Sequence, residues 1–411
     1  MTGHENFDAV VVGGGPSGAT AADDLARAGF KVLLLDRAGR IKPCGGAVPP
    51  RLLKDFDVPL DQLCATANEA RMIAPSGMMV DMPVSAGAAG GFVGMVDRDV
   101  FDEWLRARAA SHGAERRAGT FETLARDADG TAVIEYRPKG AARGGEPMRV
   151  RAKVVLGCDG GNSAVARAAL PEPAPKFVAA YHEVIDSPPE GVNGFAGGRC
   201  DVFYQGKLSP DFYAWIFPHG GKTSVGVGSA KKGFELRKAV AQLRAETGLD
   251  ACHTVRVEGA PIPLKPRKRW DNGRDVVVAG DAAGVVAPAS GEGIYYAMTA
   301  GRLAAESAMA FLKTGNAAEL KTARKRFMKA HGQVFRVLGI MQWFWYSNDN
   351  MRERFVKLCR DPDVQQLTWE AYMNKELVRR KPMAHVRVFI KDTRQLIGAL
   401  FTGRRQPEAR A

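Results

Sequence analysis

The sequence predicts an α/β fold in three parts: a parallel βαβ unit at the start of the chain, an antiparallel β-sheet in the middle and a helical region at the end. Three observations support this prediction. An apolar, β-branched run at residues 7–12 leads directly into a glycine-rich turn and an Ala-rich segment. Aromatic and apolar residues alternate with period two over residues 202–227. From residue 320 onward the pattern is mainly helical.

The first element is a strand, turn, helix and second strand in immediate succession. Residues 13–18 read GGGPSG, which fits the pattern G-x-G-x-x-G. An Ala-rich helix is expected over residues 19–28, and a second apolar run, residues 31–35, ends in Asp36. In this context the pattern is the dinucleotide-binding fingerprint of a Rossmann-like domain. The first part of the chain is therefore expected to bind a dinucleotide.

Each glycine of the fingerprint has a physical task. Gly13 permits the tight turn, Gly15 lets the backbone approach a pyrophosphate, and Gly18 lets the helix pack closely on the strand. The helix N-terminus favours phosphate through its free N–H groups and dipole, and Asp36 is placed to accept hydrogen bonds from a ribose. We assign to this site Gly13, Gly15, Pro16, Ser17, Gly18, Asp36 and Arg37.

The segments that follow alternate between irregular and regular structure. Residues 40–50 are rich in Gly and Pro and form no regular element in our prediction. A helix is expected over residues 97–113, with Asp99 as its N-cap and Gly113 as its end. A hairpin turn at residues 141–145 should join strands at 131–136 and 148–155.

Two further strands end in an aspartate beside glycine. Residues 154–157 lead into Asp159 and Gly160, and residues 275–279 lead into Gly280 and Asp281. Ligands of open α/β sheets bind at this carboxyl edge of the strands. Three glycine-flanked strand ends suit a ligand that has several sugar and phosphate groups and a ring system.

The third strand end continues into another helix. Gly291 and Gly293 precede an Ala-rich helix expected over residues 293–312, whose N-terminus offers a second positive dipole end. We add both glycines to the candidate site.

Length and composition exclude several classes of protein. The chain has 411 residues, enough for two or three cores. It shows no cationic apolar leader and no apolar window long enough to span a bilayer. Its cysteines are scattered without a C-x-x-C pair, which favours reduced thiols in a cytoplasmic protein over disulfides or a zinc site. They are Cys44, Cys64, Cys158, Cys200, Cys252 and Cys359.

Positive charge is concentrated at the C-terminus. Residues 321–411 hold 20 Lys and Arg against 8 Asp and Glu, a net +12, whereas the first 320 residues carry +1. No nucleic-acid recognition motif accompanies this charge, so we expect no nucleic-acid partner. An anionic membrane surface, an acidic electron-donor protein and a merely solvated helical face all remain open as explanations.

In order and spacing, the three strand-end motifs resemble the FAD motifs of hydroxylase-type flavoproteins of the glutathione-reductase-like fold. The resemblance implies that Asp281 holds the ribityl chain, that Arg98 approaches the phosphates and that Asp36 holds the adenosine ribose. It also implies a discontinuous FAD-binding domain, an antiparallel substrate-binding domain and a helical basic region. Their expected bounds are 1–72, 92–175 and 268–318 for the first, 73–91 and 176–267 for the second, and 319–411 for the third.

Two more segments resemble the geranylgeranyl reductase family. Residues 42–48, KPCGGAV, resemble its P-C-G-G loop, and residues 213–218, YAWIFP, followed by Gly226 and Gly228, resemble its Y-x-W-x-F-P segment. The resemblance covers nearly the whole chain and is nearest to the branch that makes phytyl tails of chlorophyll and bacteriochlorophyll.

The P-C-G-G loop and the Y-x-W-x-F-P segment add residues to the candidate site. Cys44 is either a proton donor beside the flavin or a small packing residue, and Gly45 and Gly46 allow the backbone to lie against a flat ring. The YAWIFP side chains either line a prenyl site or form ordinary sheet core. The residues concerned are Tyr213, Trp215, Phe217 and Pro218.

An aromatic cluster at residues 343–346 allows three interpretations. It lies in an apolar run, residues 334–346, that is too short to span a bilayer. Its side chains can be core, tunnel lining or an interfacial anchor, and core is the reading that we favour.

The resemblance implies an FAD-dependent reductase that hydrogenates isolated double bonds of a geranylgeranyl chain to give phytyl. Its substrate would be a geranylgeranyl pigment or geranylgeranyl diphosphate, with NADPH as donor, and its place the cytoplasmic side of the photosynthetic membrane. The sequence contains no second dinucleotide fingerprint, so NADPH would reach the flavin without its own Rossmann domain. Two alternatives are a flavin monooxygenase of an apolar substrate and a non-catalytic prenyl escort protein, which resembles GDP-dissociation inhibitors.

Overall fold

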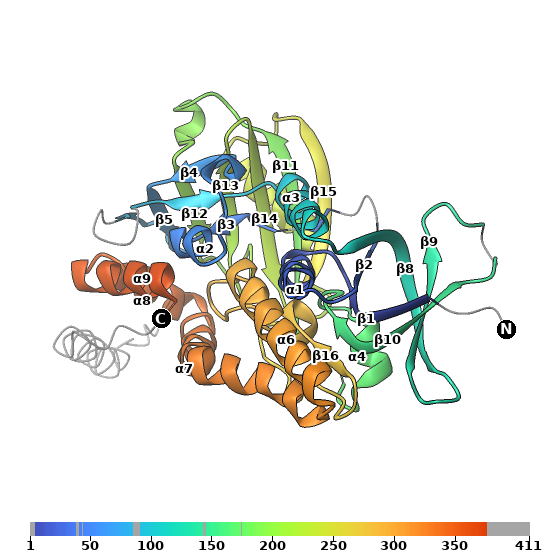
Figure 1. The fold of residues 1–411 in the computed structure, drawn as a ribbon. Helices are drawn as coiled ribbons and strands as arrows, with labels where there is room; N and C mark the ends of the chain where they lie inside the picture. The colour runs from blue at the N-terminus through green and yellow to red at the C-terminus, as the bar shows by residue number, and fades with distance from the viewer. Residues whose placement is uncertain are drawn as a thin grey trace, which may run out of the picture.

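The computed structural model describes residues 5–37, 41–42, 44–84, 91–142, 145–173 and 175–375. Within these residues the chain builds two large β-sheets, with helices packed against and between them (Figure 1). The predicted α/β class is confirmed, because a mainly parallel sheet, a mainly antiparallel sheet and a helical C-terminal part are all present.

The first sheet has a parallel core in the order β8–β2–β1–β10–β16. Strand β9 pairs antiparallel with both β8 and β10, so the predicted pairing of the strands on either side of residues 141–145 is confirmed, although residues 143 and 144 of the predicted turn lie outside the described residues. The strand bounds are β1 (Glu5–Val12), β2 (Val32–Asp36), β8 (Glu115–Arg126), β9 (Ala132–Pro138), β10 (Met148–Gly157) and β16 (Val276–Val278).

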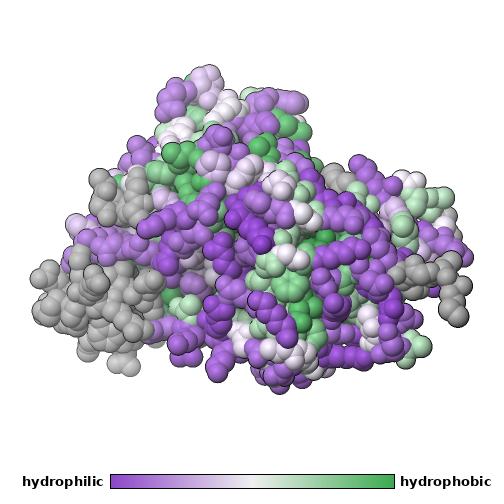
Figure 2. Space-filling model, viewed as in Figure 1, coloured by the Kyte–Doolittle hydropathy of each residue, from purple (hydrophilic) through white to green (hydrophobic). Residues whose placement is uncertain are grey.

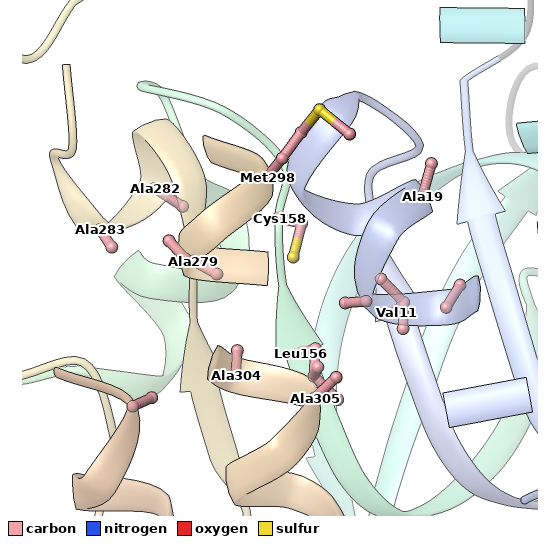
Figure 3. Packing of buried hydrophobic residues seen from close by; sticks show 14 of the residues in the cluster. Val11, Ala19, Leu156, Cys158, Ala279, Ala282, Ala283, Met298, Ala304 and Ala305 are labelled. Atoms are coloured by element: carbon pink, nitrogen blue, oxygen red, sulfur yellow. The ribbon is translucent and has the colours of Figure 1, made fainter. Parts of the chain in front are cut away.

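Helices α1 (Pro16–Arg27) and α6 (Ile294–Thr314) lie side by side against this sheet (Figure 1). Small side chains make the close approach possible, since a Cβ at Gly301 of α6 would lie 2.1 Å from the Ser17 carbonyl oxygen of α1. Figure 3 shows the same packing, with Ala19, Ala304 and Ala305 lying among strand residues such as Val11 and Leu156. This contact holds the fingerprint turn in place from behind.

The second sheet has the order β15–β11–β14–β13–β12–β5–β6 and is antiparallel except between β12 and β5. The predicted antiparallel region at residues 202–227 is therefore confirmed. Strands β5 and β6 come from an earlier part of the chain than their neighbours. The bounds are β5 (Glu69–Ile73), β6 (Met79–Pro83), β11 (Val178–Asp186), β12 (Arg199–Phe203), β13 (Ala214–His219), β14 (Lys222–Ser229) and β15 (Thr254–Ile262).

A third, small sheet has the strand order β3–β7–β4. Its strands are β3 (Ala47–Val48), β7 (Val93–Met95) and β4 (Ala65–Ala67). Strand β3 forms inside the Gly- and Pro-rich stretch where we expected no regular element, because Ala47 and Val48 pair with β7.

The remaining helices connect or cover the sheets. They are α2 (Pro50–Asp55), α3 (Arg98–Ser111), α4 (Ala164–Ala169), α5 (Leu236–Glu246), α7 (Lys321–Trp345), α8 (Asp349–Leu358) and α9 (Pro362–Asn374). Short 3₁₀ turns are η1 (Leu60–Gln62), η2 (Val192–Gly194), η3 (Gly280–Ala283) and η4 (Ala317–Leu320).

The predicted cap of α3 is wrong by two residues. The helix begins at Arg98 and its N-cap is Asp97 rather than Asp99. Asp97 makes no side-chain capping bond, because its carboxylate instead contacts His219. A tertiary partner has therefore replaced the local interaction that the sequence suggested.

The aromatic cluster of residues 343–346 divides between core and surface. Trp345 and Tyr346 are buried, as predicted. Trp343 is 77% exposed, so the prediction that the cluster belongs to the core is wrong for that side chain. Polar residues cover much of the face seen in Figure 2, with apolar residues in patches among them. Among the described residues, no helix has both the length and the apolarity needed to cross a bilayer.

Candidate active site

A polar cavity of about 390 Å³ lies at the carboxyl ends of β1, β2 and β10. Most of the predicted dinucleotide residues line it: Gly13, Gly15, Pro16, Ser17, Asp36, Arg37, Asp159 and Asp281. The three strand ends that the sequence identified separately therefore meet in one place.

The glycine turn has the shape that an extended phosphate needs. Gly13 has φ +102°, and a Cβ there would lie 2.4 Å from the Cys158 carbonyl oxygen. A Cβ at Gly18 would lie 1.8 Å from the Gly13 carbonyl oxygen, so both glycines are required by the fold. A Cβ at Gly15 would meet no protein atom within 4 Å. Since Gly15 borders the cavity, its missing side chain leaves room for a ligand and not for packing.

The start of α1 faces this cavity without a side-chain cap. Gly15 is the N-cap residue, Pro16 follows at the first helical position, and no side chain bonds the first-turn amides. Helix N-termini of this kind bind anions, because their N–H groups and the helix dipole both favour negative charge. The turn thus fits the pyrophosphate of a dinucleotide.

Asp36 lies at the end of β2 beside an arginine that the sequence did not single out. The Arg106 guanidinium is 3.4 Å from the Asp36 carboxylate and donates a hydrogen bond of 3.2 Å to the Gly14 carbonyl. Burial raises the pKa of Asp36, while the Gly14 amide and the Arg106 charge oppose that rise. Arg106 belongs to α3 and lines the polar cavity.

Asp159 performs a local structural task at the cavity wall. Its carboxylate accepts hydrogen bonds from the Ser163 hydroxyl and from the backbone amides of Ala164 and Val165. It thereby holds the start of α4, and burial raises the pKa of this carboxyl. The backbone of Gly160 beside it also lines the polar cavity.

An apolar cavity of about 280 Å³ adjoins the polar one. Tyr213, directly before β13, and Trp215 and Phe217 on β13 line it from one side, as the period-two pattern predicts. The Tyr213 hydroxyl donates to the Ser290 carbonyl at 2.7 Å, and burial raises the pKa of that hydroxyl. The same alternation places Pro218 on the opposite face of the strand and outside the cavity lining, so we do not carry it into the proposed substrate site.

The two cavities share a boundary. Pro16, Lys42, Asp281 and Ala297 line both of them. Lys42 forms an ion pair with Asp281, whose side chain is 6% exposed. A ligand with a nucleotide in the polar cavity would therefore carry its ring system past Asp281 to the mouth of the apolar cavity.

Cys44 lines the apolar cavity close to that boundary, together with Gly45, Gly46, Gly291 and Gly293. Gly46 has φ +73° and donates its amide to the Cys44 sulfur at 3.4 Å. Pro43 lies outside the described residues. Two glycines of the predicted set, Gly18 and Gly280, lie behind the cavities: a Cβ at Gly280 would come within 2.7 Å of the Ser17 Cβ.

Arg98 sits beside Cys44 and lines the apolar cavity, not the polar one. Its guanidinium donates twice to Asp102, at 2.8 and 2.7 Å. Burial lowers the pKa of Arg98, but Asp102 and the Cys44 sulfur raise it, and the net direction is upward. The predicted contact of Arg98 with cofactor phosphates stays a prediction, and the arginines that line the polar cavity are Arg37, Arg106 and Arg167.

His219 holds the Cys44 loop from the other side. One ring nitrogen, Nε2, is 3.1 Å from the Gly45 carbonyl oxygen, and Nδ1 is 3.0 Å from the Asp97 carboxylate. Burial lowers the pKa of His219, but Asp97 and Cys64 raise it to about 9. The imidazole is therefore protonated at neutral pH and donates both of these hydrogen bonds.

Several cavity residues had no signal in the sequence. Tyr204, directly after β12, and Trp369 and Tyr372 on α9 close the apolar cavity, although the sequence indicated only helix around the last two. The aromatic residues at Trp369 and Tyr372 lie three apart, a helical spacing that could have indicated a buried face. Nothing in the sequence linked that face to this site.

Comparison with known proteins identifies the class. The family model described as an FAD binding domain matches residues 6–185. A geranylgeranyl diphosphate reductase from Rhodobacter capsulatus is 54% identical over 392 residues, covering 95% of this chain and 98% of the relative. The chloroplastic geranylgeranyl diphosphate reductase of Oryza sativa is 33% identical, covering 95% and 86% respectively. A digeranylgeranylglycerophospholipid reductase from Methanoculleus marisnigri is 31% identical, covering 92% and 96%.

Solved structures agree on the fold. A geranylgeranyl bacteriochlorophyll reductase-like protein from Thermoplasma acidophilum superposes with a TM-score of 0.77 at 22% identity, covering 93% of this chain and 100% of that one. A flavin-dependent brominase gives a TM-score of 0.68 at 16% identity, covering 95% and 100%. These likenesses show a shared flavoprotein fold, and the identity and coverage of the curated relatives decide the family. The chain belongs to the geranylgeranyl reductase family of FAD-dependent oxidoreductases.

Proposed function

We propose that this protein uses FAD to hydrogenate isolated double bonds of a geranylgeranyl chain, giving phytyl for chlorophyll or bacteriochlorophyll. One observation carries the proposal: a polar, glycine-lined cavity and an apolar, aromatic-lined cavity meet beside Cys44 and Asp281. The first suits a dinucleotide and the second suits an isoprenoid, and their shared boundary is where a reaction between the two would occur.

The polar cavity would hold FAD through residues already placed there. The Gly13–Ser17 turn and the α1 N-terminus would bind the pyrophosphate, Asp36 and Arg106 the adenosine half, and Asp281 the ribityl chain. Bound FAD, once reduced, supplies a hydride. Lys42 now pairs with Asp281, and we expect that pair to rearrange when the ribityl chain takes its place.

Cys44 would supply the proton. An isolated trisubstituted double bond is not polarised by a carbonyl, so hydride attack alone is unfavourable. A proton added to the less substituted carbon gives the other carbon tertiary cation character, which the hydride then quenches. Cys44 supports this role because it lines the apolar cavity at its boundary with the polar one, with the Arg98 guanidinium beside it to stabilise the thiolate left behind.

The apolar cavity would bind the prenyl tail. Burial of hydrocarbon is worth about 25 cal/mol per Å², and the wall offers Tyr213, Trp215 and Phe217 together with Trp369 and Tyr372. Reduction of three double bonds in turn requires the tail to slide or to rebind. Whether the tail carries a diphosphate or a pigment is left open by the residues at this cavity, and NADPH is the donor that we propose.

The expected result is a stepwise gain of hydrogen by the substrate. Anaerobic protein incubated with a geranylgeranyl substrate and NADPH should give products two, four and six hydrogens heavier, measured by mass spectrometry. A parallel reaction with dithionite as reductant tests the alkene reduction without NADPH. If product forms with dithionite but not with NADPH, the alkene reduction stands and NADPH is not the donor. If reduced flavin is present and no product gains hydrogen with either donor, the proposed function is wrong.

Membrane association is a second part of the proposal, because the substrate tail is lipid-soluble. Along α7, Lys325, Lys329 and Arg336 are exposed and are followed at helical spacing by Ile340 and Trp343, exposed by 59% and 77%. A helix face that combines cations with an exposed tryptophan is typical of interfacial binding. Each cation near anionic lipid is worth about 1 kcal/mol. The feature supports peripheral binding through this face.

We expect the protein to float with anionic vesicles at low salt and to be released at high salt, because exposed charges are screened over about 8 Å at physiological ionic strength. Trp343→Ala should weaken flotation, whereas Phe177→Ala, which removes an aromatic side chain 48% exposed elsewhere, should not. Absence of flotation with anionic lipid at low salt would contradict the membrane proposal and favour an acidic electron-donor protein as the partner of the basic region.

A further inference from the structure

A small polar cavity lies behind the Cys44 loop, apart from the two cavities described above. Its volume is about 10 Å³, close to the least space that one water molecule occupies. It is unusual in the number of charged and titratable side chains that surround so small a space. These are Lys42, Cys44, Asp97, Arg98, His219, Arg256 and Glu258.

These groups come from four different parts of the fold. The loop before β3 supplies Lys42 and Cys44, the start of α3 supplies Asp97 and Arg98, β13 supplies His219, and β15 supplies Arg256 and Glu258. These residues are far apart in the sequence, so the cluster forms only when the second sheet packs against the nucleotide-binding part of the chain. Four of them, Asp97, His219, Arg256 and Glu258, have no task in the proposed reaction.

The cluster continues on both sides into hydrogen-bonded histidines. His219 contacts Asp97 at 3.0 Å and the Cys64 sulfur at 3.6 Å. Cys64 is exposed, so this end of the cluster reaches solvent. On the other side Glu258 is 2.8 Å from His182, which in turn lies 2.8 Å from the Ser224 hydroxyl.

The proposed reaction creates a need for such a cluster. If Cys44 gives its proton to a double bond, it becomes a thiolate inside a largely apolar site, and it must regain a proton before the next double bond can react. Water cannot enter freely from the substrate side while a prenyl tail fills the apolar cavity. The small polar cavity touches both Cys44 and His219, and His219 in turn contacts Cys64, which is exposed to solvent.

We propose that His219, oriented by Asp97, returns a proton to Cys44 across this cavity between successive double bonds, a role that rests on the proposed function of Cys44. In the step, the imidazolium releases the Nε2 proton, which it otherwise donates to the Gly45 carbonyl, to a water molecule in the cavity, and that water gives a proton to the thiolate. The products are the Cys44 thiol and neutral His219, which keeps its Nδ1 proton toward Asp97, and a proton from solvent then restores the imidazolium. Arg98 stabilises the thiolate while it waits.

The charges around the cavity favour the protonated form of His219, the form that holds a proton to give. His219 is protonated at neutral pH, since Asp97 and Cys64 raise its pKa to about 9. Asp97 has its pKa lowered by the same hydrogen bond to His219 and stays a carboxylate, as does Glu258, whose pKa is lowered by His182 against the effect of burial. His219 is therefore a charged acid in this set, and its contact with the exposed Cys64 links it to solvent.

The substitution His219→Gln removes the proton that His219 can release but keeps its hydrogen bond to the Gly45 carbonyl. A glutamine amide can still donate to the Gly45 carbonyl, but it cannot release a proton. We expect the variant to reduce the first double bond at the wild-type rate, because Cys44 begins protonated, and then to slow each later reduction on the order of 100-fold. Rapid-quench mass analysis would show one fast two-hydrogen gain per enzyme followed by slow ones, with KM unchanged.

Two controls make the result specific. His253→Gln alters a surface histidine that is 3.1 Å from Asp186 and far from the cavity lining, and it should behave as wild type. In protein without flavin, iodoacetamide should alkylate Cys44 more slowly in His219→Gln at neutral pH, since a nearby positive charge that favours the thiolate is lost. Peptide mapping distinguishes Cys44 from the other cysteines.

The outcomes separate the relay from the role of Cys44. If His219→Gln slows the first and later reductions by the same factor, or slows none of them, or leaves Cys44 alkylation unchanged, the relay is overturned. If Cys44→Ser retains the wild-type rate, the proposed role of Cys44 fails whatever His219 does. A burst limited to one reduction in His219→Gln, with Cys44→Ser inactive from the start, supports both.

Discussion

Gly15→Val is expected to fold normally and to purify without flavin. A Cβ at this position meets no protein atom within 4 Å, and Gly15 has an ordinary backbone conformation with φ −74°. The side chain would instead project into the polar cavity at the uncapped start of α1, where the pyrophosphate is proposed to lie. The visible absorbance of the purified variant, compared with its protein concentration, measures the flavin content.

The matched control for this experiment is Gly221→Val. Gly221 also has open space around its missing Cβ, but it lies in the turn between β13 and β14, outside both cavities. We expect this variant to retain flavin and both variants to keep the wild-type circular dichroism spectrum. Full flavin occupancy in Gly15→Val would mean that the dinucleotide does not pass this turn, and the assignment of the cavity would be wrong.

Cys44→Ser is expected to keep its flavin and lose most of its activity. The variant preserves size and the hydrogen bond from the Gly46 amide, but a hydroxyl is a much weaker acid than a thiol. General acids typically contribute 10²- to 10⁴-fold to a rate, so kcat should fall by on the order of 100-fold or more. Steady-state rates of alkene reduction, measured with a chemically reduced flavin, isolate this step from the electron donor.

Cys252→Ser provides the comparison, since Cys252 is a half-buried thiol that packs in a different cluster, away from both cavities. Its rate and flavin content should match those of the wild type. An unchanged rate in Cys44→Ser would assign Cys44 to packing, the alternative that the sequence left open, and would require another acid at the boundary of the cavities.

Much of the nucleotide-binding part could be predicted from sequence because its determinants are local. Gly13 must be glycine to turn at φ +102°, and Gly18 must be glycine because its neighbour in space is the carbonyl of Gly13, five residues away. A buried strand followed by such a turn and an Ala-rich helix leaves few other structures. The same holds for the face of β13, where period-two alternation alone places Tyr213, Trp215 and Phe217 together.

Other features were decided by packing between distant segments. The sequence indicated Asp99 as the cap of α3, but the cap lies two residues earlier, at Asp97, whose carboxylate contacts His219, 122 residues away. It favoured a buried Trp343, which instead lies on the outer face of α7, because one helix turn of aromatic residues cannot all face inward.

The dinucleotide turn, the strand-end acids, the aromatic strand face and the family resemblance were thus contained in the sequence alone, since contiguous residues carry each of them. Only the tertiary structure brought Arg106 to Asp36, α9 over the apolar cavity, and His219 to the carbonyl of Gly45, 174 residues away. Such contacts depend on how one sheet docks on another and on the register of their strands. A single sequence carries no local signal for either, because the free energy that selects them is shared among many distant buried side chains.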